Sequence, residues 1–583
     1  NQVEIAKSQL LRITCRQGNF IFSDGEWKKL EHTGKTLREH YGKLPSILSL
    51  ITKEQFQTIT EEADTAVLIQ GIAGSGKTTV ALHRLSWLLH ENNSELKEED
   101  CIILVLSKSL KAYIQDSLPA LQIFNVPVAT LQDWAFEIIR NIPTKRPDVE
   151  SWQRPEERCP AGIGRLKRSF AMLKALELYA RKQSEELYKY LALKLPWDAL
   201  PSGIRSIFDK YVDIRVAPGL LLEEVSESIS LASQRVDSSH SRSSGLSQAM
   251  CIISEQRGKL GDLCGDLLEI LSHPKPIIEF DETKLIDEEL VRQAYERSLR
   301  NFSQGFIDSQ DDALLIRLFQ MKFGGLPTKE GGVRRYGHVI VDEIQDLSPI
   351  DIENVIGAVS DLKKLTLAGD IQQRIDDSAN FPGWEKLKED MLFKDSIPHF
   401  VTLNVSHRST LPIMRLADHV QRQRLVKEGR HGRVPIFFKC RSESQGIKSA
   451  INWLKKAEEK YPTAITAVIC ADEEQARQIF KYLKPSFGHS LRLGTQDSFS
   501  FEEGILVTDI KQVKGLEFCN VLIWNPSKNK FPDNEISRNM LYVAITRAEE
   551  NLCIVSWQTP SLLLPTMGSK LLRWVDLTSP EEE

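Results

Sequence analysis

The sequence predicts an α/β fold in which two lobes, each built on a parallel β-sheet, follow one another, with a mainly helical insertion in the first lobe. Two observations lead to this prediction. Short runs of aliphatic and β-branched residues alternate with helical patterns in two successive blocks, as in parallel sheets covered by helices on both faces. The chain has 583 residues, 41% of them hydrophobic, which is enough for several packed units.

The strands of both predicted sheets are short apolar runs. In the first block they are Ala66–Gln70, Cys101–Ser107, Pro127–Thr130, His338–Val341 and Lys364–Ala368. In the second block they are Phe400–Leu403, Pro435–Cys440, Ile465–Cys470, Gly504–Ile510, Asn520–Trp524 and Leu552–Trp557. Because most of these runs are apolar throughout, we expect both faces of each sheet to be buried.

The segment between the third and fourth strands has a different pattern. Apolar residues recur at spacings of three and four within Arg168–Leu193, and Glu288–Phe302 is similar, which predicts helices. Ser226–Ser247 is rich in serine and is expected to be a mobile loop. The predicted units are an N-terminal segment (1–50), a first lobe (51–140 and 336–398), a helical insertion (141–335), a second lobe (399–560) and a C-terminal tail (561–583).

Composition excludes several classes of protein. No apolar run reaches the length of a membrane-spanning helix, and the polar N-terminus does not resemble a secretory signal. The 9 cysteines are scattered singly, without the paired spacing of zinc ribbons or iron–sulfur sites. We therefore expect a cytoplasmic chain with no membrane partner. Since the net charge is -5, any nucleic-acid site must be a local basic track.

The sharpest local pattern is a glycine-rich loop between an expected strand and an expected helix. It comprises Gly71, Ile72, Ala73, Gly74, Ser75, Gly76, Lys77 and Thr78, followed by Thr79. Glycines let the backbone curl so that its N–H groups face phosphate oxygens at the start of the helix. In such a loop the lysine neutralises the terminal phosphates and the following threonine ligates Mg²⁺. The sequence therefore predicts a site for ATP and Mg²⁺.

Paired carboxylates end another expected strand. Asp342 and Glu343 directly follow the apolar run Val339–Val341. Parallel strands of such a sheet open onto the ligand crevice at their carboxyl ends, where the glycine-rich loop also lies. Asp342 suits the outer shell of Mg²⁺, and Glu343 suits orientation and deprotonation of the attacking water.

Seven motifs, in order between Ile51 and about Trp557, resemble those of UvrD/Rep-type superfamily 1 helicases. They are Ile51–Gln55, the glycine-rich loop, Asp342–Asp346, Leu367–Gln373, Ser406–Ser409, Val513–Phe518 and Leu541–Ala548. The resemblance implies two RecA-like lobes that form an ATP cleft. Gln70–Gly71 with Ala81–Arg84, and Ile103–Ser107 with Ala112–Ile114, are closest in wording to the HelD-like branch.

The resemblance also implies roles for single residues. Gln55 would read the adenine edge, Glu517 would hold the ribose, and His407 stands where the family has a tyrosine that stacks on adenine. Gln373 would sense the γ-phosphate, and Arg408 and Arg547 would act as arginine fingers from the second lobe. The implied catalytic set is Lys77, Glu343, Gln373, Arg408 and Arg547.

Two departures from the family pattern concern strand separation. Arg374, Asp376 and Asp377 stand where the family has aromatic residues that stack on single-stranded bases, although Phe381 or Trp384 could substitute. About 100 residues separate the arginine of the Ser406–Ser409 motif from Thr508, too few for the large second-lobe insertion of processive members.

The function that the resemblance implies is a nucleic-acid-dependent ATPase acting as a 3′-to-5′ helicase or translocase, with single-stranded or tailed DNA as partner. One alternative is a HelD-like ATPase that remodels RNA polymerase. Another is a nucleotide-switch subunit of a nuclease or defence complex.

Two basic tracks are candidate strand paths. Arg154–Lys182 contains 8 basic and 3 acidic residues, interleaved with Trp152, Phe170 and Tyr179. Arg408–Arg433 contains 7 Arg or Lys residues. Basic residues with aromatic platforms suit single-stranded nucleic acid. Phe170 and Tyr179 share helical spacing with leucines, however, so the first track is equally consistent with a solvated helix whose aromatic residues belong to the core.

Overall fold

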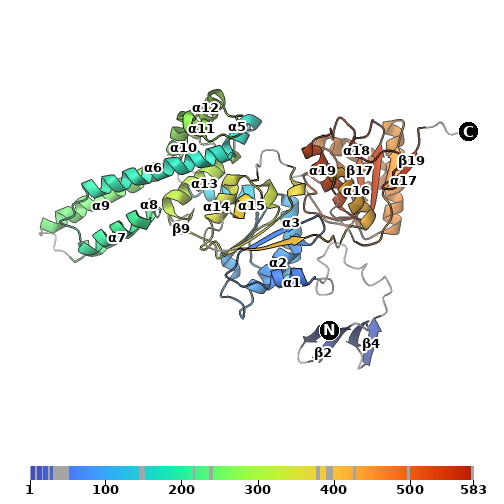
Figure 1. Cartoon of the computed structure of the whole chain (residues 1–583), viewed down its shortest axis with the longest axis horizontal. Coiled ribbons are helices and arrows are strands. Elements are labelled where there is room, and N and C mark those ends of the chain that lie inside the picture. Colours follow the sequence, from blue (N-terminus) through green and yellow to red (C-terminus); the bar gives the residue numbers. More distant parts are fainter. Residues whose placement is uncertain are drawn as a thin grey trace, which may run out of the picture.

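The computed structural model describes residues 2–6, 9–15, 18–23, 26–30, 52–142, 151–214, 217–235, 241–375, 381–388, 398–406, 408–423, 429–495 and 499–578. The chain begins with a four-stranded antiparallel sheet that sequence analysis did not predict. Its strands are β1 (Gln2–Ala6), β2 (Gln9–Cys15), β3 (Gly18–Ser23) and β4 (Glu26–Leu30). Two α/β lobes follow, and a helical arm extends from the first of them (Figure 1).

The first lobe is built on six parallel strands in the order β12, β5, β11, β10, β6, β7. The strands are β5 (Val67–Gly71), β6 (Cys101–Val105), β7 (Val128–Thr130), β10 (His338–Val341), β11 (Leu365–Gly369) and β12 (His399–Leu403). The helices are α1 (Lys53–Ile59), α2 (Lys77–Leu88), α3 (Lys108–Ser117), α4 (Leu131–Ile139), α14 (Pro349–Ile356) and α15 (Trp384–Lys386). Only β11 separates β5 from β10, so the glycine-rich loop and the paired carboxylates share one sheet edge.

One strand belongs to a different sheet from the one predicted. Phe400–Leu403 was assigned to the second block, but β12 pairs with β5 of the first sheet, with Val401 opposite Ile69. An apolar run of this length can complete either parallel sheet, and its position in the sequence does not specify its partner. The chain therefore crosses to the second lobe after β12.

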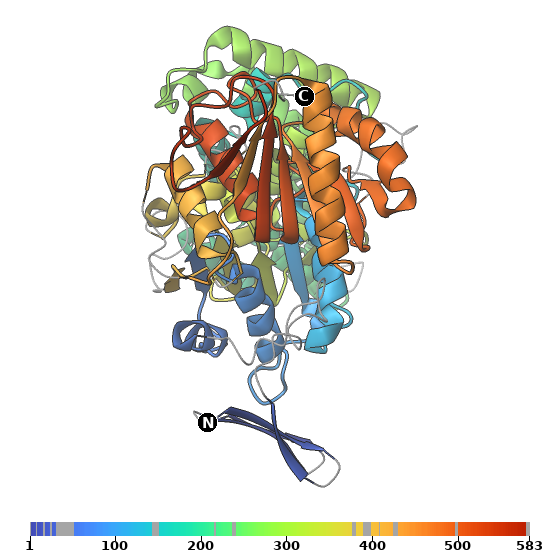
Figure 2. The ribbon, with the colours of Figure 1, turned by 90° about the vertical axis from the view of Figure 1, so that its right-hand side faces the viewer.

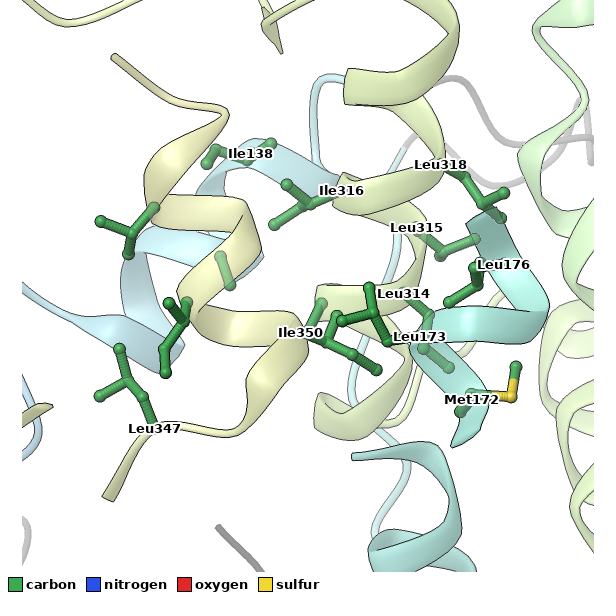
Figure 3. Close-up of a cluster of buried hydrophobic side chains, with 14 of the residues drawn as sticks. Ile138, Met172, Leu173, Leu176, Leu314, Leu315, Ile316, Leu318, Leu347 and Ile350 are labelled. Atoms are coloured by element: carbon green, nitrogen blue, oxygen red, sulfur yellow. The ribbon is translucent and has the colours of Figure 1, made fainter. Parts of the chain in front are cut away.

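Alternate residues of the first sheet face two different cores. Leu68 and Leu104 belong to a core with α4, α13 (Ser309–Phe323) and α14, whereas Ile69 and Ile103 belong to one with α2 and α3. Figure 3 shows part of the first core, with Ile138, Met172, Leu173, Leu176, Leu314, Leu315, Ile316, Leu318, Leu347 and Ile350 labelled. Since Leu173 and Leu314 come from the insertion, that insertion packs directly onto the first lobe.

The insertion is mainly helical, as predicted. Its helices are α5 (Ala161–Lys167), α6 (Phe170–Lys194), α7 (Ser202–Ile214), α8 (Pro218–Ser233), α9 (Ser241–Leu260), α10 (Leu263–Ser272), α11 (Pro274–Glu279), α12 (Glu288–Gln304) and α13 (Ser309–Phe323). A short hairpin, β8 (Leu326–Pro327) and β9 (Val333–Arg334), follows them. Among the helices that the structure describes, none is long and apolar enough to cross a membrane.

Most of the serine-rich segment is helical rather than the mobile loop that its composition predicted, and residues 236–240 lie outside the described residues. Ser226–Ser233 lies in α8 and Ser241–Ser247 lies in α9. These helices pack together in a separate small core through Leu221, Leu222, Val225, Ile229, Leu246, Ala249 and Ile253. Serine is only mildly unfavourable in helices, so burial of the intervening aliphatic residues decides the structure.

The second lobe has seven parallel strands in the order β15, β16, β14, β17, β18, β13, β19. They are β13 (Ile436–Lys439), β14 (Ile465–Cys470), β15 (Leu491–Leu493), β16 (Gly504–Asp509), β17 (Phe518–Trp524), β18 (Ala548–Ser556) and β19 (Arg573–Asp576). The helices are α16 (Leu411–Gln421), α17 (Glu443–Lys460), α18 (Glu473–Phe487) and α19 (Glu535–Thr546). Figure 2 views the chain from this lobe, with α17 beside the sheet.

The predicted C-terminal tail contributes to this sheet. β19 pairs with β13, and the Trp574 ring lies against the Phe437 ring with centroids 4.1 Å apart. The second lobe therefore extends past residue 560, its predicted end. A four-residue edge strand with one aromatic residue carries little periodicity, which is why the pattern missed it.

Candidate functional site

The glycine-rich loop joins the end of β5 to the start of α2. Gly74 and Gly76 have φ of 70° and 82°, in the left-handed region that favours glycine. A Cβ on Gly74 would lie 2.7 Å from Oγ of Ser406, so the loop also leaves no room for a side chain there. The expected strand–loop–helix context of the motif is confirmed.

Lys77 and Thr78 are the first two residues of α2, and their side chains form hydrogen bonds with different groups. The Lys77 ammonium donates to the carbonyls of Gly71 (2.9 Å) and Ile72 (3.2 Å). The Thr78 hydroxyl donates to Oδ2 of Asp342, 2.5 Å away. A hydroxyl beside a carboxylate is a suitable oxygen donor set for Mg²⁺, so these residues fit the predicted metal.

The paired carboxylates at the end of β10 titrate differently. Burial, with the nearby charge of Glu343, raises the pKa of Asp342 to about 6. Burial also opposes ionisation of Glu343, but the cations of Lys514, Lys77 and Arg547 outweigh it and hold the Glu343 pKa below its usual value. Glu343 has φ of 62°, a conformation uncommon for this residue type.

Arg547 follows α19 and is buried at the junction of the lobes. Its guanidinium donates to the carbonyls of Val543 (3.1 Å) and Leu516 (2.8 Å) and to Oε1 of Gln373 (3.0 Å). Gln373 in turn donates to Oδ2 of Asp370, 2.7 Å away. A chain of hydrogen bonds therefore links a second-lobe arginine to the first-lobe motif after β11.

Arg408 also bridges the lobes. Nη2 donates to the hydroxyl of Thr79 in α2 (2.9 Å), and Nη1 pairs with the carboxylate of Glu517. Tyr542 in α19 makes a further contact between lobes, because its hydroxyl accepts a 3.4 Å hydrogen bond from the backbone N–H of Ala73. Both predicted arginine fingers therefore form hydrogen bonds with residues of the first lobe, Arg408 with Thr79 and Arg547 with Gln373.

One cavity brings most of the predicted residues together, and we call it the nucleotide pocket. Its lining comprises Gly74, Gly76, Lys77, Thr78, Thr79, Tyr113, Glu343, Gln373, Arg408, Gly515, Glu517 and Arg547. Of the other predicted residues, Gln55 donates to the carbonyl of Ser75 (2.9 Å) and accepts from the backbone N–H of Thr52 (3.0 Å). Gln55 therefore supports the loop from outside the lining. His407 lies outside the described residues.

Sequence reasoning missed three residues at this site: Tyr113, Lys514 and Tyr542. Each lies inside or beside a motif, but in a helix or loop where its type gave no signal. Lys514 is 5% exposed and pairs with Asp346, and its Nζ lies 3.7 Å from Oε2 of Glu343. Only the three-dimensional proximity of the two lobes reveals this contact.

A second cavity of about 560 Å³, which we call the groove, lies next to the nucleotide pocket. It is bounded by the first lobe, the start of α13 in the insertion and the loop from Lys511 to Lys514 of the second lobe. Glu343 lines both cavities.

Three helices begin at the groove. Ser107 caps α3, Thr130 caps α4 and Ser309 opens α13, and all three line the cavity. Helix N-termini attract anions through their N–H groups and dipoles.

Five carboxylates also line the groove: Asp133, Asp312, Glu343, Asp346 and Asp351. Asp312 pairs with Arg154, Asp351 pairs with Arg168, and Glu343 and Asp346 both lie beside the Lys514 ammonium. Because most of these carboxylates are paired with cations, the groove suits an anionic ligand better than the number of its carboxylates suggests.

The first basic track is largely structural. Lys167 is buried, with Nζ 2.6 Å from Oδ1 of Asp311, and Arg181 and Lys182 pair with Glu185 and Glu186 on the same helix. Trp152 is buried, and Phe170 and Tyr179 pack against the core, which favours the helix-face interpretation. Arg168 is the member of this track that lines the groove.

Three arginines of the second basic track are paired within the chain. Besides Arg408, Arg422 contacts Asp533 (2.7 Å) and Arg430 pairs with Glu550. Residues 424–428 of this track lie outside the described residues. The basic tracks thus give a weaker indication of a strand path than the groove does.

Comparison with known proteins agrees with the motifs. Residues 51–376 match the UvrD/REP helicase N-terminal domain, and residues 504–555 match the UvrD-like helicase C-terminal domain. One similar solved structure is the C-terminal domain of a possible DNA helicase from Lactobacillus plantarum WCFS1, with 24% identity over 29% of this chain and 99% of that chain and a TM-score of 0.25. No curated protein sequence matches. With more than half of its length matched, the chain belongs to the UvrD/Rep helicase family.

Proposed function

We propose that the chain is a nucleic-acid-dependent ATPase that hydrolyses ATP between its two lobes and uses the cycle to move along single-stranded DNA. The observation that carries this proposal is the shared wall of the two cavities. Glu343, placed to act as the hydrolytic base, lines the nucleotide pocket and the groove together. A strand in the groove would therefore lie next to the group that activates water.

The first lobe supplies the phosphate site. Lys77 and the loop N–H groups bind the β- and γ-phosphates, and Thr78 and Asp342 are the residues that would hold Mg²⁺. Mg²⁺ would neutralise charge on the phosphates during transfer. Glu343 accepts a proton from the attacking water, which requires the ionised form that its lysine and arginine neighbours favour.

The second lobe supplies the arginines. Arg408 and Arg547 stabilise charge on the transferring phosphoryl group, and Gln373 connects Arg547 to the first lobe. Glu517, a carboxylate in the same pocket, is unsuited to phosphate and suits the hydroxyls of the ribose. Gln55 and His407 are assigned to the adenine end by family resemblance. Loss of the γ-phosphate removes a group that both lobes contact, so hydrolysis would loosen their closure.

The groove supplies the strand path. Phosphates would lie against the N-termini of α3, α4 and α13, and Lys511 on the second-lobe side would move with that lobe. Opening and closing of the lobes would then change the grip on the strand at the two sides of the groove in turn. Translocation from 3′ to 5′ is the direction that the family resemblance implies.

The proposal is tested by steady-state ATP hydrolysis with single-stranded DNA, duplex DNA and single-stranded RNA as separate additions. We expect a basal rate that single-stranded DNA raises at least tenfold, with duplex DNA much less effective. Lys77→Ala should abolish both the basal and the stimulated rate. Stimulation by RNA polymerase but by no nucleic acid would contradict the proposal and favour a remodelling ATPase.

A further inference from the structure

Two side-chain amides of the second lobe hold the first-lobe turn that carries Gln373, a short helical turn after β11. Gln421, the last residue of α16, donates through Nε2 to the backbone carbonyl of Gln372 (3.3 Å) and to Oδ1 of Asn539 in α19 (3.0 Å). Asn539 in turn donates through Nδ2 to the backbone carbonyl of Arg374, 2.8 Å away. We call Gln421 and Asn539 the amide clamp.

The turn around Gln373 has few backbone hydrogen bonds of its own. The backbone N–H of Gln373 donates to the carbonyl of Asp370 (2.9 Å), and that of Arg374 donates to the carbonyl of Ile371 (3.3 Å). The last carbonyls of so short a turn have no partner within it. The amide clamp supplies partners for the carbonyls immediately before and after Gln373. The second lobe therefore fixes the backbone from which the Gln373 side chain extends.

The same turn connects the two cavities. Gln373 lines the nucleotide pocket, and Ile375, two residues later, lines the groove. Arg547, which follows α19, donates to Oε1 of Gln373 (3.0 Å). The C-terminal part of the second lobe therefore holds the side chain of Gln373 through Arg547 and the backbone beside it through Asn539. Because both contacts cross between the lobes, opening of the lobes would break them together.

We propose that Gln421 and Asn539 are positioning residues that hold Gln373 toward the nucleotide pocket when the lobes close. Amides suit this task because they both donate and accept, so Asn539 binds a backbone carbonyl while it accepts from Gln421. Neutral amides also leave the charge of Arg547 available for the transferring phosphoryl group. The inference rests on the proposed function, since Gln373 acts in that reaction.

The test uses two substitutions that approximately keep side-chain shape and remove the hydrogen bonds, Asn539→Leu and Gln421→Met. ATP hydrolysis is measured with saturating single-stranded DNA. For each variant we expect kcat to fall about tenfold, with KM for ATP within about threefold of wild type, because positioning matters most in the transition state.

The matched control is Gln445→Met on α17. Gln445 is half-buried, as Gln421 is, and it donates to the backbone carbonyl of Leu577 (2.9 Å) within the second lobe. This hydrogen bond does not cross between the lobes, so the control should match wild type in both kcat and KM.

A Gln373→Ala background shows whether the clamp acts through Gln373. With that side chain removed, Asn539→Leu and Gln421→Met should each lower kcat no further, since the residues act together. Because Asn539 is 5% exposed and Gln421 is half-buried, Gln421→Met tests the clamp at a position that tolerates substitution more readily.

Wild-type kcat in either folded clamp variant would overturn the inference, and so would an undiminished tenfold loss in the Gln373→Ala background. The second result would mean that the amides act independently of Gln373. A wild-type chain without ATPase activity under any addition would overturn the proposed function, and this inference with it. An active wild type with equally active clamp variants would overturn the inference alone.

Discussion

Nζ of Lys514 in the second lobe lies 3.7 Å from Oε2 of Glu343 at the carboxyl end of β10 in the first lobe. Lys514 also pairs with Asp346, and all three side chains line the groove. The charge that stabilises the carboxylate of Glu343, the proposed hydrolytic base, therefore lies on a loop that a strand in the groove would touch. The two cavities therefore share one lining residue, Glu343, and the charge of Lys514 in the groove also acts on that residue.

The first prediction concerns the pH dependence that follows from this contact. Lys514→Met removes the cation that most strongly lowers the Glu343 pKa, so that pKa should rise. Since the base acts when ionised, the acid limb of kcat/KM against pH should move to higher pH. Lys511→Met, which removes a groove lysine away from Glu343, should leave the limb in place. An unmoved limb in Lys514→Met would argue against the assignment of Glu343 as the base.

The second prediction separates phosphate binding from water activation. Lys77→Ala removes the loop cation, so ATP affinity and turnover should both fall. Glu343→Gln keeps the size and polarity of the side chain but not its basicity, so ATP should bind nearly as in wild type and persist unhydrolysed. Equilibrium binding of a fluorescent ATP analogue and single-turnover hydrolysis measure the two effects. Wild-type hydrolysis by Glu343→Gln would rule out this base.

The third prediction concerns Arg547. Its four acceptors require a planar group with several donors: the carbonyls of Val543 and Leu516, the amide of Gln373 and the hydroxyl of Thr546. Arg547→Lys should therefore lower kcat by roughly a thousandfold, as loss of an arginine finger does elsewhere, with ATP affinity within about tenfold of wild type. The measurement is kcat with saturating single-stranded DNA. Near-normal turnover would mean that the fork of the guanidinium is dispensable.

The fourth prediction is that the isolated chain separates strands poorly. Trp384 is 4% exposed and packs between the rings of Phe381 and Phe400, so it does not replace the stacking aromatics that the family places after Gln373. Asp376 and Asp377 lie outside the described residues. Each missing stack removes roughly 1–3 kcal/mol of grip on single-stranded bases.

This prediction is checked with a 3′-tailed duplex of about two helical turns, about 20 bp, in saturating ATP with a trap for the released strand. We expect vigorous ATP hydrolysis and little single-cycle unwinding. Unwinding of most of the duplex in one binding event would show that another part of the chain supplies the grip.

The site was more predictable from sequence than the fold around it. The loop from Gly71 to Thr78 and the pair Asp342–Glu343 are contiguous, and their chemistry depends on local backbone shape. Tyr113 was missed because a tyrosine in an amphipathic helix is typical of a core position, and its ring does pack against the core. Arg408, which lines the same pocket, is almost 300 residues away in sequence. Residue type and spacing carry no information about such proximity.

The errors in the fold have a similar origin. Phe400–Leu403 was predicted as a strand, but its pairing with β5 depends on tertiary structure. The serine-rich helices α8 and α9 form because they bury aliphatic residues against each other, an energy that composition does not reveal. Most strands of the two lobes followed from pattern, whereas the N-terminal sheet, β19, the serine-rich helices, sheet membership and helix pairing required the structure.

We expect a strand bound in the groove to stimulate ATP hydrolysis in the neighbouring nucleotide pocket. The measurement that tests it most directly is the concentration of single-stranded DNA that gives half-maximal ATPase stimulation, in wild type and in Lys511→Glu. Lys511 is exposed and lines the groove but not the nucleotide pocket. For the variant we expect an unchanged ATPase rate without DNA, a several-fold higher half-maximal DNA concentration and a weaker dependence of that concentration on salt. A half-maximal concentration equal to that of wild type would contradict it.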